Sequence, residues 1–386
     1  MPAATRVLLA LAATHTAFAA FIPAASPLLS WSGRYAVDDA AAGTVAFDSE
    51  STACAFTVLS PGPNATSVWL VASLALASPA NVGRVSVYIN DYEAQNLLLV
   101  QGAAVRYLLA AGLAPGANNV SVAWAMEPIV GGTDRPARLT PVFLGFDVEG
   151  PGAIAAAAPL ARRIDILGDS ITAGSMYDRI EAVGGALSLE TGCHPWAPAY
   201  GYSQTSNWES YLCRFFRANC TTTAWSGGAL VDPATLNPSC RGKAYVPQLY
   251  RQTFLTDKQS AWDFSASSRP DAVIIYLGTN DYGCGVTDAN FTAALVALVN
   301  NATRYYAASP GPPTTHFFLT LGPMAPTKPA AAVQAALAQL TGAGVAASLL
   351  NMTAATLDGC GGHPGPIGHF EMAVAAKGQI AAAMGW

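Results

Sequence analysis

Two patterns of hydrophobic residues divide this chain and predict two domains of different fold class. Between residues 30 and 150, short apolar or alternating runs are broken by turn residues such as Pro61-Gly62-Pro63 and Asn90-Asp91, which is typical of β-strands. Between residues 161 and 386, strand-length apolar runs alternate with helix-length segments, which favours a parallel sheet covered by helices on both faces. We therefore predict an all-β sandwich of the jelly-roll kind, followed by a three-layer α/β domain.

The individual elements follow from these patterns in chain order. In the β-domain we expect strands at residues 44–47, 55–59, 67–76, 84–89, 96–100, 105–109, 120–125 and 142–148. The small residues and prolines at 151–160 predict a linker. In the α/β domain we expect strands at 164–167, 221–225, 272–277, 316–321 and 345–350, and helices at 288–306, 331–340 and 366–384. A further helix is expected to begin at a capping box formed by Ser206 and Glu209.

Residues 1–19 have the layout of a secretory signal peptide. Arg6 precedes an apolar run at 7–13, and the small residues Ala17 and Ala19 stand where cleavage requires them. Six N-x-[ST] glycosylation sequons follow, at Asn64, Asn119, Asn219, Asn290, Asn301 and Asn351. We therefore expect a secreted, N-glycosylated protein of the extracellular space or cell wall. Its glycans would hydrate the surface of a chain in which only 11% of the residues are charged.

Charge and composition argue against several classes of partner. The net charge is −5 and Lys and Arg do not cluster, which argues against a nucleic-acid partner. The charge-free stretch at 329–357 is interrupted by Gln334, Gln339 and Asn351, so we expect a helix, a turn and a strand there rather than stable membrane insertion. The seven cysteines fit an oxidising compartment, and none has zinc-finger spacing. We expect a monomer without a bound metal.

The residues that can carry chemistry follow the ends of the predicted strands of the α/β domain. Gly168-Asp169-Ser170 follows the first strand, Ser226-Gly227-Gly228 the second and Gly278-Thr279-Asn280-Asp281 the third, while His363-Pro364 precedes the last helix. The carboxyl ends of parallel strands lie at one edge of the sheet, so these segments should meet there. Acyl transfer by a serine needs a hydroxyl at a helix start, an imidazole and donors for an oxyanion, and all three are available here.

The four blocks, in this order, resemble the SGNH or GDSL-like hydrolases over residues 163–386. The resemblance implies a flavodoxin-like sheet in the α/β domain. The G-x-S-x-G signature of α/β-hydrolases is absent from the sequence, which argues against that other serine-hydrolase fold.

A β-domain ahead of such a hydrolase domain is similar to carbohydrate esterase family two, whose members remove acetyl groups from plant or microbial polysaccharides. The matching pieces are Trp31-Ser32-Gly33-Arg34, Ala125-Met126-Glu127, Ala224-Trp225-Ser226-Gly227-Gly228 and Asp358-Gly359-Cys360. The favoured function is therefore O-deacetylation of an acetylated polysaccharide. The alternatives are a lipase or small-ester esterase of the same fold, and a carbohydrate-binding protein without turnover.

The resemblance implies a role for each matching residue. Ser170 would be the nucleophile that forms an acyl-serine, and His363 would be the general base. The backbone N–H groups of Ser170 and Gly227 and the side chain of Asn280 would form the oxyanion hole. No metal and no organic cofactor would take part.

The remaining histidines are expected to play no catalytic role. His15 would leave with the signal peptide and His194 lies in an insertion at 176–202, which is expected to form a loop over the active site. His316 lies inside a predicted strand, and His369 is expected to face away on the last helix.

One position departs from the usual pattern of the larger family. Many of these hydrolases have an Asp three residues before the catalytic His, but Cys360 stands there in this chain. Members of carbohydrate esterase family two often lack that Asp and use a Ser-His dyad whose imidazole bonds to a backbone carbonyl. Asp358 could orient His363 instead, or it could simply form the turn before Gly359.

Three disulfides are expected among the six cysteines after Cys54. We predict a Cys284–Cys360 bond that clamps the two catalytic loops, because Cys284 follows Asn280 and Cys360 lies in the loop of His363. Cys213 would close a short loop with Cys220. Cys193 would then pair with Cys240 across the insertion.

Overall fold

The computed structural model describes residues 20–62, 66–74, 83–126, 141–175, 181–183, 186–188, 205–325 and 327–386. The predicted signal peptide at 1–19, the sequon residue Asn64 and most of the insertion, with Cys193 and His194, lie outside these residues. A short antiparallel hairpin within the insertion, β14 (Glu181–Val183) and β15 (Ala186–Ser188), is described.

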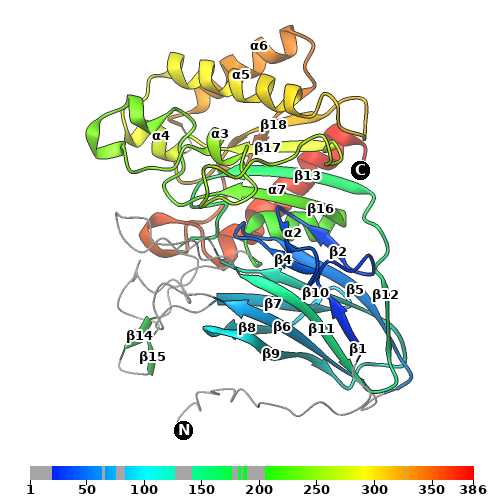
Figure 1. Cartoon of the computed structure of the whole chain (residues 1–386). Helices are drawn as coiled ribbons and strands as arrows, with labels where there is room; N and C mark the ends of the chain where they lie inside the picture. Colours follow the sequence, from blue (N-terminus) through cyan, green and yellow to red (C-terminus); the bar gives the residue numbers. More distant parts are fainter. Residues whose placement is uncertain are drawn as a thin grey trace.

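The N-terminal domain consists of two antiparallel six-stranded sheets (Figure 1). The first sheet has the order β3-β4-β11-β6-β9, with β1 paired to β11. Its strands are β1 (Ala20–Pro23), β3 (Ala36–Asp39), β4 (Thr44–Ala46), β6 (Ser67–Leu74), β9 (Gly102–Ala111) and β11 (Val142–Glu149). The second sheet has the order β12-β5-β10-β7-β8, with β2 paired to β5. Its strands are β2 (Ser30–Ser32), β5 (Ala53–Ser60), β7 (Gly83–Ile89), β8 (Tyr92–Leu99), β10 (Gly116–Trp124) and β12 (Ala153–Ala156).

Alternation of buried and exposed residues explains why these segments form a sandwich. Along β5, every second side chain is buried, so one face of the strand enters the core. Aromatic rings from both sheets and their connections fill that core. Phe56 lies 4.7 Å from Phe146 between ring centroids, and Phe47 lies 4.9 Å from Phe143. Each predicted strand of this domain is found, and β12 lies within the segment 151–160 that was expected to be a linker.

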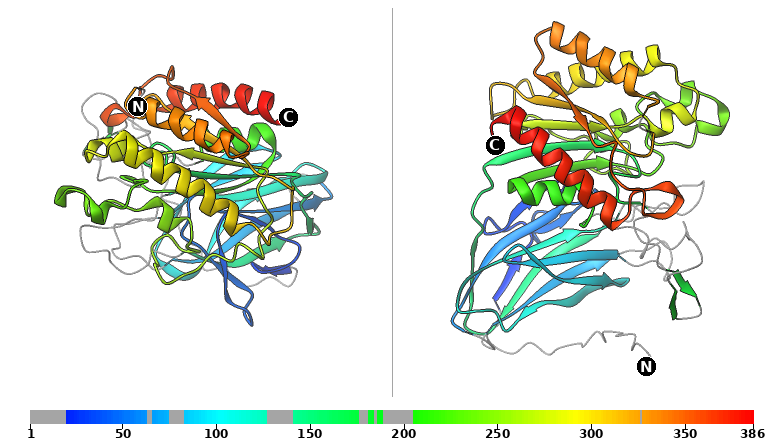
Figure 2. Two further views of the ribbon diagram at one scale, coloured as in Figure 1. Left: turned by 90° about the horizontal axis from the view of Figure 1, so that it is seen from above. Right: turned by 180° about the vertical axis from the view of Figure 1, so that it is seen from behind.

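The C-terminal domain is built on a five-stranded parallel sheet with the order β16-β13-β17-β18-β19. The strands are β13 (Arg162–Gly168), β16 (Ala218–Ala224), β17 (Ala272–Tyr276), β18 (His316–Leu321) and β19 (Ala347–Asn351). Helices α2 (Trp208–Phe216) and α7 (Pro366–Met384) cover one face, and α5 (Asp288–Tyr305) and α6 (Ala330–Gly342) cover the other (Figure 2). Neighbouring residues of one strand serve opposite faces: Ile274 packs toward α2 and α7, whereas Ile275 packs toward α5 and α6. The predicted three-layer α/β domain is confirmed.

Helix α2 begins one residue later than the capping box predicted. The N-cap is Asn207, whose side-chain oxygen accepts a hydrogen bond from the Ser210 N–H at 3.0 Å. Glu209 does not turn back to cap the helix. Its buried carboxylate instead accepts hydrogen bonds from the hydroxyls of Ser51 at 2.6 Å and Thr222 at 2.8 Å.

The sandwich is joined to the α/β domain through buried polar groups. Ser51 belongs to a buried loop of the sandwich, so its bond to Glu209 connects the two domains. In the same loop, the carboxylate of Asp48 accepts hydrogen bonds from the backbone N–H groups of Leu255 at 2.7 Å and Thr256 at 2.9 Å. Ser49 donates to the Thr222 carbonyl at 2.9 Å. These bonds fix the sandwich beside the edge strand β16, where Figure 1 also places it.

Arg34 is a further connection between the domains, and its side chain is fully buried. Its guanidinium donates to the carbonyls of Gln252 at 2.5 Å and Leu249 at 3.2 Å. It also lies 5.0 Å from the ring centroid of Tyr250 and 5.4 Å from that of Trp262. A residue of the sandwich thus fills an aromatic box in the α/β domain.

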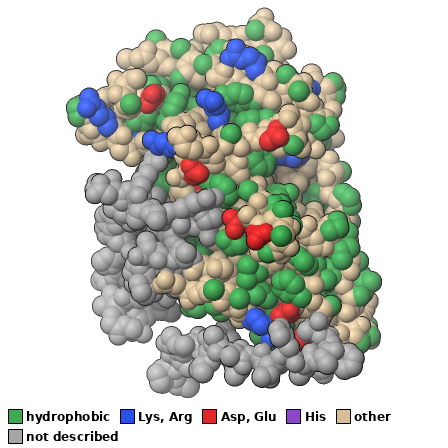
Figure 3. Space-filling view, viewed as in Figure 1, with side chains coloured by type: hydrophobic (Ala, Val, Ile, Leu, Met, Phe, Trp, Pro, Cys, Tyr) green, Lys and Arg blue, Asp and Glu red, His purple; other side chains and the backbone are tan. Residues whose placement is uncertain are grey.

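The surface in Figure 3 carries few charged side chains, in keeping with the composition. Within the described residues, no helix combines the length and apolar character needed to cross a bilayer. The Cys213–Cys220 disulfide, which closes the end of α2 onto β16, is confirmed.

Arg34→Ala should lower the free energy of unfolding by roughly 3 kcal/mol, because it leaves a cavity and deprives two buried carbonyls of their donor. Urea unfolding followed by tryptophan fluorescence measures this change. Arg251→Ala, at an exposed arginine, is the matched control and should shift the midpoint little. Equal midpoints for the two variants would contradict an anchoring role for Arg34.

Candidate active site

Ser170 lies where β13 ends at the carboxyl edge of the parallel sheet. The strand runs through Gly168, where an added Cβ would lie 2.0 Å from the Thr172 hydroxyl oxygen, so only glycine fits this close approach. The following turn is closed by a hydrogen bond from the Ile171 N–H to the Asp169 carboxylate at 3.1 Å. The local sequence therefore forces a tight turn after the strand and presents the Ser170 side chain, which is 9% exposed.

His363 is brought to Ser170 from the opposite end of the domain. The Ser170 Oγ lies 2.9 Å from the His363 Nε2, across 193 residues of sequence. On the other side of the ring, Nδ1 lies 3.2 Å from the carbonyl oxygen of Cys360. A carbonyl can only accept, so Nδ1 carries the proton and Nε2 is left to accept one from the serine hydroxyl.

Burial controls the protonation of this imidazole. Desolvation lowers the pKa of His363 below its usual value, and hydrogen bonds to the backbone at Cys360 and Gly361 oppose the shift only in part. The ring is therefore neutral, and able to accept a proton, at a lower pH than an exposed histidine.

Asp358 is occupied elsewhere. Its carboxylate accepts hydrogen bonds from the backbone N–H groups of Gly365 at 2.7 Å, Gly368 at 2.9 Å and Ile367 at 3.0 Å. Burial alone would raise the pKa of Asp358, but these bonds outweigh it and lower that pKa. Of the two arrangements that the sequence left open, the imidazole bonds to a backbone carbonyl, and Asp358 caps the start of α7.

Gly227 and Asn280 come from the loops after the neighbouring strands. Gly227 adopts a φ of +79°, which favours glycine, and its surroundings leave open space on the side of a Cβ. Asn280 lies in the short helix α4 (Thr279–Gly283), and its amide nitrogen donates to the Gly228 carbonyl at 3.0 Å. The loops after β16 and β17 are thus hydrogen-bonded to each other.

Two buried carboxylates that the sequence analysis gave no role hold these loops in place. Asp281 accepts hydrogen bonds from the backbone N–H groups of Leu230 at 2.9 Å and Val231 at 2.8 Å. It thereby ties the loop of Gly227 to α4. Burial, with a smaller contribution from Asp281, raises the pKa of Asp169 to about 7. Both aspartates lie inside the sequence blocks Gly-Asp-Ser and Gly-Thr-Asn-Asp. That position could have indicated a structural role, because a buried Asp usually has a hydrogen-bond partner.

The disulfide predicted between Cys284 and Cys360 is wrong. Cys284 is bonded to Cys240, with their Cα atoms 6.1 Å apart, so the proposed Cys193–Cys240 pair is wrong as well. Cys240 ends the 3₁₀ turn η2 (Pro238–Cys240), which follows another, η1 (Pro233–Thr235), and precedes the short helix α3 (Val246–Leu249). This segment folds back over the end of α4, where Cys284 lies. Cys360, in the 3₁₀ turn η3 (Cys360–Gly362), also forms a disulfide, whereas Cys54 is a buried free thiol.

Two other histidines are described. His316 opens β18 and its Nε2 lies 2.9 Å from the Ser348 hydroxyl, far in sequence from the catalytic blocks. His369 is fully buried, and its Nδ1 accepts a hydrogen bond from the Trp208 N–H at 3.2 Å, which gives it a structural role. Burial lowers the pKa of His369 to about 3, so the ring stays neutral and joins α7 to α2.

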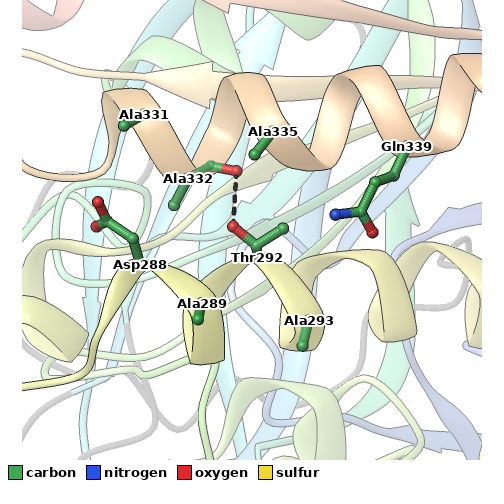
Figure 4. Close-up of a pocket in the computed structure, with 8 residues that line it drawn as sticks. All are labelled: Asp288, Ala289, Thr292, Ala293, Ala331, Ala332, Ala335 and Gln339. Carbon is green, nitrogen blue, oxygen red and sulfur yellow. Dashed lines mark hydrogen bonds between the residues drawn. The ribbon is translucent and has the colours of Figure 1, made fainter.

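A groove between α5 and α6 offers no comparable chemistry (Figure 4). The Thr292 hydroxyl donates a hydrogen bond to the Ala332 carbonyl at 3.1 Å, and most of the lining residues are alanine. Within the described residues, no group of His, Cys, Asp and Glu side chains is arranged to hold a metal ion. The lining residues are Asp288, Ala289, Thr292, Ala293, Ala331, Ala332, Ala335 and Gln339.

Solved structures that this chain resembles have the same two-domain fold. A family two carbohydrate esterase from Clostridium thermocellum, solved with cellohexaose, aligns with a TM-score of 0.73 and 21% identity, over 93% of this chain and 99% of that one. An acetyl xylan esterase from the rumen bacterium Butyrivibrio proteoclasticus aligns with a TM-score of 0.74 and 16% identity, over 96% and 100% of the two chains. A family two carbohydrate esterase from Cellvibrio japonicus aligns with a TM-score of 0.72 and 18% identity, over 95% of this chain and 98% of that one. At these identities the likeness establishes the fold.

Sequence comparison points to the same group of proteins. The chain is 29% identical over 217 residues to the cellulase/esterase CelE of Acetivibrio thermocellus, a match that spans 56% of this chain and 23% of that longer protein. Residues 164–366 match the model of the GDSL-like Lipase/Acylhydrolase family. That range begins in β13, just before Ser170, and ends beyond His363, so the matched blocks are those that the fold assembles at one edge of the sheet. The chain belongs to the GDSL-like lipase/acylhydrolase family.

Proposed function

We propose that the protein is a carboxylic ester hydrolase that removes O-acetyl groups from polysaccharide. The observation that carries the proposal is the contact of 2.9 Å between the Ser170 Oγ and the His363 Nε2, with the far side of the ring held by a carbonyl. A serine hydroxyl is a weak nucleophile unless a base removes its proton as it attacks. This arrangement supplies that base in the correct tautomer.

The proposed mechanism has two halves. Ser170 attacks the ester carbonyl while His363 takes its proton, and the imidazolium then protonates the departing sugar hydroxyl. Water, activated by the same imidazole, releases acetate from the acyl-serine. The positive ring would be stabilised by the Cys360 carbonyl, which accepts from Nδ1 in both halves.

The developing oxyanion needs donors that are already in place. We assign this role to the backbone N–H groups of Ser170 and Gly227 and to the side-chain amide of Asn280. Donors of this kind are worth about 10²–10³ in kcat each, because they need no reorganisation during the reaction. The hydrogen bonds that Asp281 accepts from the backbone N–H groups of Leu230 and Val231 support the proposal. They join the loop of Gly227 to the helix that carries Asn280.

The substrate class rests on the relatives. Among them are a carbohydrate esterase solved with cellohexaose, an acetyl xylan esterase and a cellulase/esterase. We extend this class to the present chain as acetylated plant or microbial polysaccharide, with a lipase or small-ester activity as the alternative. We also propose that the enzyme acts as a monomer.

We further propose that the β-domain is a jelly roll and that the protein is secreted with N-linked glycans. From β4 to β11, successive strands alternate between the two sheets except for the β7-β8 hairpin, as two interlocked Greek keys require. Three sequon asparagines, Asn119, Asn290 and Asn351, are exposed, which leaves room for a glycan.

Wild-type protein should release acetate from acetylated xylan or glucomannan, and Ser170→Ala should lower the rate by at least about 10⁴-fold because the nucleophile is lost. Assays of acetate release and of p-nitrophenyl acetate hydrolysis measure the wild-type rate and its loss in the variant. Ser265→Ala, at an exposed serine, is the matched control and should retain wild-type rates. Hydrolysis that survives Ser170→Ala would contradict the mechanism. A preference for p-nitrophenyl butyrate over the acetylated polymers would contradict the substrate class, and polysaccharide binding without turnover would favour a binding protein.

The value of kcat/KM should rise with pH along a limb whose midpoint lies below pH 6.5. His363 must be neutral to accept the proton, and burial lowers its pKa, so activity is gained as pH rises through that lowered value. Initial rates with p-nitrophenyl acetate between pH 4 and 9 give the limb, with circular dichroism at each pH to exclude unfolding. Asp169→Asn should keep the limb, because Asp169, whose pKa is raised to about 7, does not take the proton of the serine. A limb centred above pH 7 would argue against His363 as the base.

Asp358→Ala should reduce the free energy of unfolding by about 1–2 kcal/mol, through loss of the cap on α7, and should reduce kcat less than tenfold. Loss of an aspartate that orients the imidazole would instead reduce kcat by about 10⁴. Thermal unfolding and steady-state kinetics on the same preparation separate the two roles. Asp263→Ala, at an exposed turn carboxylate, should change neither quantity.

A further inference from the structure

Lys243 contacts the side chain that the proposed function places in the oxyanion hole. Its Nζ donates a hydrogen bond to the Asn280 Oδ1 at 3.0 Å, while the Asn280 Nδ2 donates to the Gly228 carbonyl at 3.0 Å. Lys243 is half-buried, so its charge is screened less than that of a surface lysine. Lys243 lies outside the four sequence blocks, so no role was predicted for it.

The two contacts fix which way the amide of Asn280 points. In the observed orientation, the amide oxygen faces an ammonium group and the amide nitrogen faces a carbonyl oxygen. The inverted orientation would set nitrogen against ammonium and oxygen against carbonyl, and both contacts would be repulsive. One N–H of the amide is used by Gly228, and the second remains as a donor. Lys243 therefore ensures that a donor, and never the amide oxygen, faces the forming oxyanion.

The charge of Lys243 also acts through the amide. A cation at the amide oxygen draws electron density from the nitrogen, which makes the remaining N–H a stronger donor. The ammonium further favours negative charge beyond the amide, where the tetrahedral oxyanion forms and where the ground-state ester is neutral. Such an interaction is stronger in the transition state than in the bound substrate, so it should act on kcat rather than KM.

The Cys240–Cys284 disulfide holds Lys243 in this position. The Lys243 N–H donates to the Cys240 carbonyl at 3.0 Å, and the Cys284 N–H donates to the Asn280 carbonyl at 3.1 Å. The covalent bond therefore joins the turn that carries Lys243 to the helix that carries Asn280. Lys243 also acts on the neighbouring Asp281. Burial raises the pKa of Asp281, and its backbone hydrogen bonds and the charge of Lys243 oppose that shift.

We propose that Lys243 is a positioning residue of the oxyanion hole, which orients and polarises the amide of Asn280, and that the Cys240–Cys284 disulfide keeps it there. The proposal rests on the proposed function, because it requires that Asn280 donate to an oxyanion.

The test uses Lys243→Met, which keeps the length of the side chain and removes its charge and donors. With p-nitrophenyl acetate, we expect kcat to fall about tenfold and KM to stay within about twofold. Lys243→Arg, which keeps a charged donor, should recover kcat to within about threefold of wild type. Lys258→Met, at an exposed lysine, is the matched control and should be indistinguishable from wild type.

A double-mutant cycle separates action through Asn280 from a general structural effect. In the Asn280→Ala background, Lys243→Met should change kcat less than about twofold, because the amide through which it acts is gone. In the Cys240→Ser/Cys284→Ser background its effect should shrink in the same way. A tenfold loss that persists in both backgrounds would overturn the proposal.

Other results overturn the proposal in ways that can be told apart. Wild-type kcat in Lys243→Met, with Ser170→Ala inactive, would overturn the role of Lys243 and leave the proposed function standing. A loss confined to KM, or no recovery with Lys243→Arg, would also overturn it. A wild-type protein that hydrolyses no ester would overturn the proposed function together with this inference.

Discussion

The hydrogen bond between the His363 ring and the Cys360 carbonyl sets the requirements for the rest of the site. A carbonyl fixes the tautomer as well as a carboxylate does, but it brings no full negative charge to stabilise an imidazolium. The backbone must therefore hold the carbonyl in place. Left-handed Gly361 and Gly362 make the turn that folds Cys360 back under the ring, and Asp358 fixes the start of the following helix. The Asp358 carboxylate thus bonds to the backbone that follows the loop of His363 instead of to its ring.

The β-sandwich is part of the framework of the site rather than an appended module. Its loop at 47–52 lies buried against the α/β domain, and Arg34 reaches into an aromatic box between Tyr250 and Trp262. A buried polar group that loses its partner is costly, so these hydrogen bonds favour the observed arrangement of the two domains. Edge strand β16, whose carboxyl end leads into the loop of Gly227, is held by the same contacts. Rigidity at the domain interface thus extends to one side of the active site.

The parts of the structure that depend on local pattern could be predicted from the sequence. Strands such as β18 and helices such as α7 are found at the expected residues, because strand alternation and helix length are properties of a short window. The Ser170 and His363 blocks could be placed at one edge of the sheet because the alternation of strands and helices predicts parallel strands, whose carboxyl ends lie at the same edge.

The parts that depend on contacts between distant segments could not. Asn207, and not the predicted Ser206, caps α2. The Glu209 carboxylate does not complete the capping box but accepts a hydrogen bond from Ser51 in the other domain. The partner of Cys284 depends on a turn at Cys240 that folds over α4 through a region without regular periodicity. The burial of His369 likewise depends on a distant segment, because its ring accepts a hydrogen bond from the Trp208 N–H at the start of α2.

The buried Asp169 carboxyl makes the stability of the fold depend on pH at the edge of the sheet where Ser170 lies. Its pKa rises from 3.8 to about 7 on folding, so the folded chain binds a proton that the unfolded chain releases near pH 4. The stability associated with this proton is complete below about pH 4 and is lost as the pH rises toward 7. The pKa of His363, in contrast, is lowered by burial. As the pH falls below 7, protonation of Asp169 therefore adds stability, while the imidazole of His363 remains unprotonated further into acid than that of an exposed histidine.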